Sequence, residues 1–150
     1  MSGTRTILML LGFGMISAPG LRPADLKVAL AEHDMGKRSK LALDNAGTAL
    51  KEAREAYQKG DDPALAAAAL EIEESVGLAW DSLESTGKNP RKSPRWFKPA
   101  EIETRNLLKK LDALQHDNGF EDRPVLDKAK GRLQKVHDDL LKGLMEGKSK

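Results

Sequence analysis

The sequence contains no cysteine, and it has few aromatic and β-branched residues. Without thiols the chain cannot form disulfides, use thiol chemistry or attach a lipid or haem to a cysteine. Aromatic residues make up 4% of the chain, whereas alanine, leucine, lysine and glutamate dominate it. Those residue types favour helices over strands. We therefore predict an all-α protein whose stability depends on its apolar core alone.

Common catalytic and cofactor-binding motifs are also absent. The chain has no Gly-rich phosphate loop, no Gly-x-Ser-x-Gly elbow and no His-Glu-x-x-His pair. Each of its three histidines, His33, His116 and His137, is followed by aspartate. Neighbouring residues of a helix point about 100° apart, so these pairs are not ready-made metal ligands. We predict a protein without enzymatic activity and without catalytic, cofactor-binding or metal-binding residues.

Residues 1–20 have the pattern of an export signal. Arg5 supplies a positive charge, an apolar run of about ten residues follows from Ile7 to Ile16, and small residues end the segment. A membrane span needs about 20 apolar residues, so this run is too short to be one. We predict cleavage after Gly20 and a periplasmic or extracellular protein without a stable membrane span. A buried N-terminal helix is the alternative, although the glycines and the Pro-Gly ending disfavour it.

The rest of the chain, residues 21–150, is predicted to be one helical-bundle domain of two hairpins. The hairpins cover 38–87 and 99–147, and a Pro-rich linker at 87–99 joins them. Apolar stripes with helical spacing run along 38–59, along 63–86, from Pro99 onward and along 123–146. Gly60 can end the first helix and Asp62 can cap the second, while Asp122 can cap the fourth. Short turns make successive helices antiparallel, so we predict an up-down-up-down four-helix bundle.

Two details of this scheme are further expectations. The first stripe is a heptad seam with small residues beside it, which allows a neighbouring helix to approach closely. Its members are Ser39, Leu43, Ala46, Leu50, Ala53 and Tyr57. Upstream, residues 24–35 are compatible with a short extra helix or an overhang.

The linker is the most unusual segment. Residues 87–99 hold three prolines, five bases, no acid and the adjacent pair Trp96 and Phe97. Bases beside aromatic rings can grip phosphates, sulfates or an acidic polymer. The candidate contacts to an anionic partner are Lys88, Arg91, Lys92, Arg95, Trp96 and Lys98. In the other interpretation, the bases are solvated and both rings close the end of the bundle core.

Charge is also divided unevenly along the chain. Residues 21–87 hold 8 bases and 13 acids, a balance of −5, whereas residues 88–150 hold 16 bases and 10 acids, a balance of +6. In one interpretation, an acidic and a basic hairpin attract each other within one fold. In the other, the basic half faces an anionic partner.

The layout loosely resembles haem-binding bundles of the cytochrome b562 type, through its predicted export signal, two hairpins, Lys-Ser-Pro crossover and late histidine. The resemblance implies haem ligation by a methionine of the first helix and a histidine of the fourth. Here these would be Met35 and His137. At 1.5 Å per residue they differ in height by roughly 15 Å, so the resemblance covers the architecture and not the ligands. His137 is then expected to be a histidine at the edge of the core, bonded to a neighbour.

The predicted function is that of an exported, small helical accessory or interaction protein. Its partner would be a protein or an anionic polymer of the cell envelope, and nucleic acid is an uncommon target outside the cell. Two alternatives stay open: a bundle that binds haem or another small molecule, and a binder of anionic polymers that acts through the linker.

Overall fold

The structure, a computed structural model, describes residues 24–117 and 123–147. Within these ranges the chain is all-helical, as predicted, and has no strand. The helices are α1 (Lys27–Ala31), α2 (Met35–Lys59), α3 (Asp62–Ser85), α4 (Pro94–Asp117) and α5 (Arg123–Glu146). In the described ranges, no helix is both long enough and apolar enough to cross a bilayer. The predicted export signal at 1–20 and the predicted cap at Asp122 lie outside the described residues.

Side-chain caps and a glycine set the boundaries of α2 and α3. The Asp34 carboxylate accepts a hydrogen bond from the Lys37 backbone N–H at 2.8 Å, so α2 begins three residues before the predicted start at 38. Gly60 ends α2 in the left-handed conformation, with φ 67°, which glycine adopts at little steric cost. The predicted cap of α3 is wrong by one residue. Asp61 accepts from the Ala64 N–H at 3.1 Å, whereas Asp62 is the first helical residue.

The predicted start of the third long helix at Pro99 is wrong, because α4 begins at Pro94. A proline in the first helical turn sacrifices no hydrogen bond, since the first N–H groups of a helix have no partner there. Pro99 lies inside the helix and forgoes only the bond that an N–H would donate to the Arg95 carbonyl. The linker therefore shrinks from 87–99 to 86–93, and both aromatic residues that follow it are helical.

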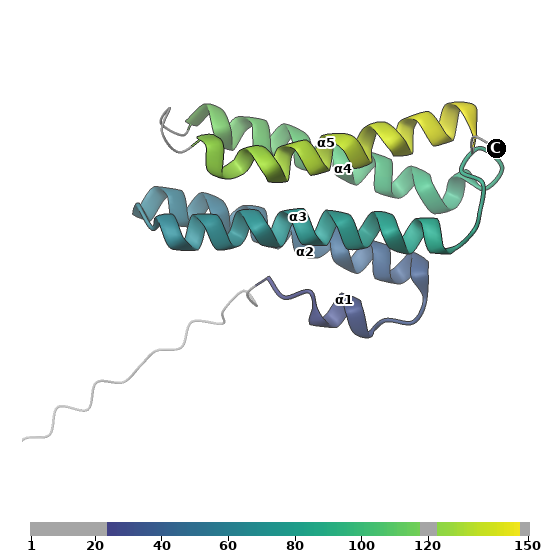
Figure 1. Cartoon of the computed structure of the whole chain (residues 1–150), viewed down its shortest axis with the longest axis horizontal. Coiled ribbons are helices and arrows are strands. Elements are labelled where there is room, and N and C mark those ends of the chain that lie inside the picture. Colours follow the sequence, from purple (N-terminus) through teal and green to yellow (C-terminus); the bar gives the residue numbers. More distant parts are fainter. Residues whose placement is uncertain (1–23, 118–122, 148–150) are drawn as a thin grey trace, which may run out of the picture.

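The four long helices form two antiparallel pairs that lie face to face as two layers (Figure 1). α2 pairs with α3 and α4 pairs with α5, while α3 packs on α5 and α2 packs on α4. The linker thus connects α3 and α4, which touch each other little. The predicted short helix upstream of α2 is present as α1, which lies outside the α2/α3 layer. Backbone N–H groups before it bind Glu52 and Asn45, both at 2.7 Å.

The two pairs bury different side chains. Among the described helices, α2 and α3 make the most extensive backbone approach, and both helices bury small residues. The small buried residues of these two helices include Ala42, Ala46, Ala49, Ala53, Ala56, Ala68, Ala69, Ser75, Ala79 and Ser82. α4 and α5 instead bury mainly leucines, namely Leu107, Leu108, Leu111, Leu114, Leu126, Leu133 and Leu140. The heptad seam predicted along α2 is buried as expected, except that Tyr57 is half-buried.

Candidate functional site

The residues predicted to contact an anionic partner lie at one end of the molecule, where the linker meets α4. Lys88, Arg91 and Lys92 belong to the linker, while Arg95, Trp96 and Lys98 belong to the first two turns of α4. These six residues are called the Trp96 surface below. Within it, Lys88 and Trp96 are half-buried and the other four side chains are exposed. The linker part is a defined turn, because the Asn89 side-chain oxygen accepts from the Arg91 N–H at 3.0 Å.

The two adjacent aromatic residues have different roles. Phe97 is 1% exposed and is one of the largest fully buried side chains, so it closes the end of the core. Trp96 packs beside the core and stays partly exposed. Its ring rests against Gly36 of α2 so closely that a Cβ atom there would lie 2.6 Å from Trp96 Cζ3. The interpretation that both rings close the core is therefore right for Phe97 and incomplete for Trp96.

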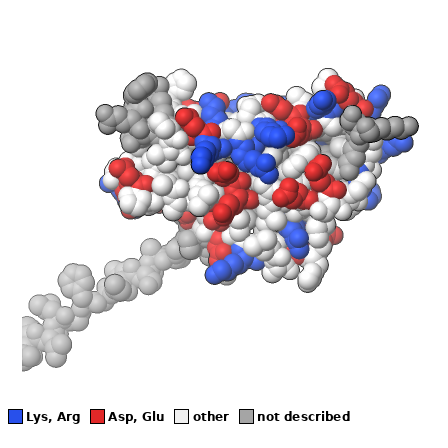
Figure 2. Space-filling model, in the orientation of Figure 1, with Lys and Arg blue, Asp and Glu red and all other residues white. Residues whose placement is uncertain are grey.

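Two cations of the Trp96 surface lie near its ring. Lys88 Nζ is 4.9 Å and Arg95 Cζ is 5.8 Å from the ring centroid, within the range of cation–π attraction. None of the five bases comes within 4 Å of a carboxylate in the part of the chain that the structure describes. Figure 2 shows basic groups at this end of the molecule with acidic groups beside them, and both signs mix on the face toward the viewer. The surface thus presents a ring and five cations that are not neutralised by contact.

Although acids and bases are divided unevenly along the chain, no ion pair joins the two layers within residues 24–117 and 123–147. Among the described residues, the ion pairs lie within one helix or between α4 and α5. One of these joins Lys130 Nζ to Asp112 Oδ1 at 2.6 Å. The expected attraction between an acidic and a basic half therefore has no short-range contact behind it, and it would act only through the screened long-range field.

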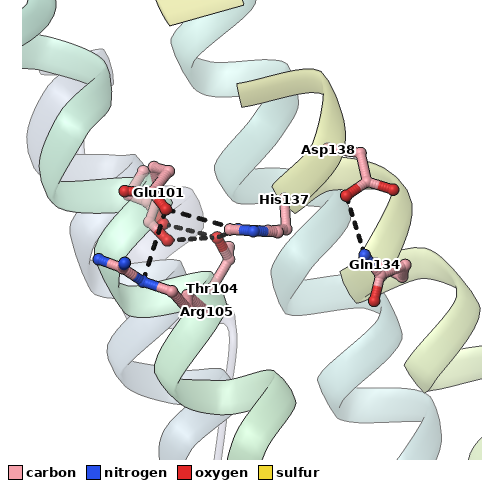
Figure 3. A network of polar contacts seen from close by, with 7 residues as sticks. Glu101, Thr104, Arg105, Gln134, His137 and Asp138 are labelled. Carbon is pink, nitrogen blue, oxygen red and sulfur yellow. Dashed lines mark hydrogen bonds and ion pairs between the residues drawn. The ribbon is translucent and has the colours of Figure 1, made fainter. Parts of the chain in front are cut away.

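A polar cluster links α4 to α5 farther along these two helices (Figure 3). The His137 ring points from α5 toward Glu101, Thr104 and Arg105 of α4. Thr104 Oγ1 lies 3.3 Å from His137 Nδ1 and 2.9 Å from the Ala100 carbonyl, to which it donates. Glu101 Oε1 is 3.9 Å from the same ring nitrogen and 3.6 Å from Arg105 Nε. The Thr104 hydroxyl also lies 3.0 Å from the Glu101 carbonyl, so backbone acceptors are available for its hydrogen.

The geometry of this cluster differs from that of a catalytic triad. A triad histidine holds its nucleophile on one ring nitrogen and its carboxylate on the other. Here both Thr104 and Glu101 approach Nδ1, and Thr104 is completely buried. The cluster therefore links two helices through polar contacts. As predicted, His137 is a histidine at the edge of the core that is bonded to a neighbour.

The other ligand candidates are not brought together. Met35 begins α2 and His137 is on α5, and these two helices do not pack on each other within the described residues. His33 is exposed before α2, and exposed His116 places Nδ1 3.2 Å from the Asp112 carbonyl at the far end of α4. Across 24–117 and 123–147, no group of three or more histidine, aspartate or glutamate side chains is arranged to hold a metal ion.

One feature escaped prediction from the sequence. A cleft opens between the first halves of α2 and α4, beside the Trp96 surface, and Ser39 is among its lining residues. The heptad seam predicts that Ser39 is buried. It does not predict the cleft, because the apolar stripes of single helices do not show which helices become neighbours. A glycine in the first turn of α2 was the available signal, since it provides room for a large side chain of another helix.

Comparisons of the chain with models of protein families, with curated proteins and with solved structures find no match.

Proposed function

We propose that the chain is an exported, non-catalytic interaction protein that binds an anionic polymer of the cell envelope through the Trp96 surface. The proposed fold is an up-down-up-down four-helix bundle, preceded by a signal peptide at 1–20. The alternating directions of α2 to α5 and their four packed faces support the bundle. The apolar run in front of small residues at 17–20 supports export.

The observation that carries the proposal is a set of five cations without an ion pair among the described residues, two of which, Lys88 and Arg95, lie near the partly exposed Trp96 ring. Bases that serve only solubility are usually interspersed with acids, whereas residues 87–99 contain five bases and no acid. Phe97, which follows Trp96 in the helix, is buried and holds the start of α4 on the core. The cations at 95 and 98 are thus presented from a fixed helix, which lowers the entropy cost of binding.

An extended polyanion fits this surface better than a small anion does. The cations belong to two consecutive segments and do not converge on one deep pocket, so each can meet a separate sulfate, phosphate or carboxylate of a repeating chain. The sum of several such contacts depends strongly on salt. The non-catalytic part of the proposal is supported by the His137 cluster, whose acid and hydroxyl groups share one ring nitrogen.

Retention on immobilised heparin in a salt gradient tests the binding. A variant with Arg91, Lys92 and Arg95 replaced by serine should elute at clearly lower salt and melt like the parent. The matched control replaces Lys109, Lys110 and Lys128, which are exposed on α4 and α5, and therefore loses the same net charge. If the two variants elute together, net charge alone explains the retention and the Trp96 surface is not the site.

Export is tested separately. N-terminal sequencing of the extracytoplasmic protein should begin at Leu21. A retained Met1 in that fraction would contradict the predicted cleavage.

A further inference from the structure

Two glycines, one from each layer, lie against the segments that carry the Trp96 surface. The first is Gly36, the second residue of α2. A Cβ atom at this position would lie 2.6 Å from Cζ3 and 2.9 Å from Cε3 of the Trp96 ring. No Cβ atom fits that close to a ring carbon, so alanine at position 36 would push the ring away.

The second glycine, Gly143 near the end of α5, makes room for the linker in the same way. A Cβ atom there would lie 3.0 Å from Pro90 Cγ and 3.3 Å from Pro90 Cβ. Pro90 is buried and its ring is rigid, so it has little freedom to yield. The preceding residue, Asn89, holds the turn that follows, because its side-chain oxygen accepts from the N–H groups of Arg91 and Lys92 at 3.0 and 3.3 Å. The turn that carries two of the cations is therefore seated on α5 through Pro90.

The contact at Gly36 concerns two other cations. Lys88 Nζ and Arg95 Cζ lie 4.9 and 5.8 Å from the centroid of the Trp96 ring, so a shift of the ring would change the position of both cations relative to it. Gly36 therefore affects the cations around the ring, whereas Gly143 affects those of the turn.

We propose that Gly36 and Gly143 are positioning residues that hold the cations of the Trp96 surface in the arrangement that binds the anionic polymer. The inference rests on the polymer binding proposed above, and it adds that affinity depends on the arrangement of the cations as well as on their number. A surface that is held in place before binding loses less entropy when the polymer binds. Because neither glycine carries a charge, their contribution can be separated from that of net charge.

The chain offers a matched control on each of the two helices. On α2, a Cβ atom at Gly47 would meet only Leu107 Cδ2 among the described residues of other segments, at an ordinary distance of 3.8 Å. On α5, a Cβ atom at Gly131 would meet no described atom of another segment within 4 Å. Alanine at any of the four positions leaves the net charge unchanged. Gly147 is unsuitable for this test, because its φ of 83° would strain any other residue.

The four single glycine-to-alanine variants of the full chain are compared on immobilised heparin in a salt gradient, below their melting temperatures. Gly36→Ala and Gly143→Ala should elute at clearly lower salt than the parent, whereas Gly47→Ala and Gly131→Ala should elute with the parent. The slope of log affinity against log salt concentration should also fall by about 1 for each cation that no longer meets the polymer. A substitution that only lowers stability would leave this slope unchanged in the folded protein.

Pro90→Ala tests the mechanism at α5. It removes the Cγ atom that lies nearest to position 143, so Gly143→Ala should lower the elution salt less in a Pro90→Ala chain than in the parent. The positioning role is overturned for either glycine if its alanine variant elutes like its control while the serine variant of the Trp96 surface still elutes early. If that serine variant elutes together with its lysine control, polymer binding at the Trp96 surface fails, and the positioning role fails with it.

Discussion

The α2/α3 pair and the α4/α5 pair have the same antiparallel topology but achieve dense packing by different means. In the first, alanine and serine let two backbones approach closely, so contact is made largely by main chain and Cβ atoms. In the second, leucines separate the backbones and fill the space between them. The stability of the first pair therefore depends on residues being small, and that of the second on residues being large.

The contrast also explains where the cleft lies. α2 carries small residues where it packs on α3. Near its start it also presents small residues toward α4. Gly36 accepts the Trp96 ring, whereas the small Ser39 side chain is buried beside the cleft and its hydroxyl has no hydrogen-bond partner among the described residues. Unfilled volume is expected where a small-residue surface meets a helix that is held at leucine spacing.

The largest effect is expected from removing volume in the second pair. Leu133→Ala should lower the free energy of unfolding by about 3 kcal/mol, since Leu133 is 1% exposed and its loss leaves a cavity between large neighbours. Leu141→Ala is the control on the same helix. Leu141 is 41% exposed and should cost less than about 1 kcal/mol. Similar urea melts for the two variants would contradict the assignment of the buried face of α5.

Adding volume to the first pair should also destabilise the fold. Ala46 is completely buried in the close approach of α2 and α3, so Ala46→Leu should force the helices apart at a cost of about 2 kcal/mol. Ala66→Leu on the exposed face of α3 should stay within about 0.5 kcal/mol of the parent. If Ala46→Leu is as stable as Ala66→Leu, the first pair is not limited by the size of its residues.

The sequence indicates the contrast between the pairs because the contrast depends on the spacing of residues within single helices. The seam from Ser39 to Ala53 and its flanking alanines are set by helical spacing within one helix, and the structure buries them as predicted. The start of α4 was misplaced for an equally local reason. Three prolines suggested an irregular segment, but Pro94 and Pro99 sit in an early part of the helix where one lost hydrogen bond is outweighed by burial of Phe97.

The candidate sites were predictable only in part. The six residues of the Trp96 surface follow from composition, because five bases and no acid stand out in any chain. The separate roles of Trp96 and Phe97 depend on the helical phase of α4. The sequence predicts that this helix starts at Pro99, whereas it starts at Pro94, so the two roles were not predicted. The cleft depends on the packing of α2 against α4, two helices that are not consecutive, and no periodicity within either helix encodes that contact.

Unlike the two substitutions above, Ser39→Ala should stabilise the first pair. The substitution removes a buried hydroxyl without a partner and introduces a better helix former, so the free energy of unfolding should rise by about 1 kcal/mol. Ser75→Ala makes the same chemical change where the hydroxyl accepts from Asn45, and it should destabilise by about 1 kcal/mol. If both substitutions change the free energy of unfolding in the same direction, Ser39 Oγ has a hydrogen-bond partner in solution.

The smallest effect is expected at the surface, where the two pairs are alike. Lys40–Asp44 on α2 and Lys135–Asp139 on α5 are ion pairs of the same spacing, at 2.8 Å and 2.7 Å. The lysines are 77% and 65% exposed, so Lys40→Ala and Lys135→Ala should each change the free energy of unfolding by less than about 0.5 kcal/mol. High salt should remove even this difference.

The pH dependence of the Lys40 pair follows from its contacts. The hydrogen bond and the charge of Asp44 raise the pKa of Lys40 above its ordinary value of 10.5. A raised pKa adds stability below the unfolded value and loses it as the pH climbs through the folded value. Melts of the parent and of Lys40→Ala should therefore differ by a constant small amount from neutral pH to about pH 10, and converge only above that. A difference that grows between pH 5 and pH 8 would place the coupling elsewhere, because Lys40, whose pKa is raised above 10.5, keeps its charge in that range.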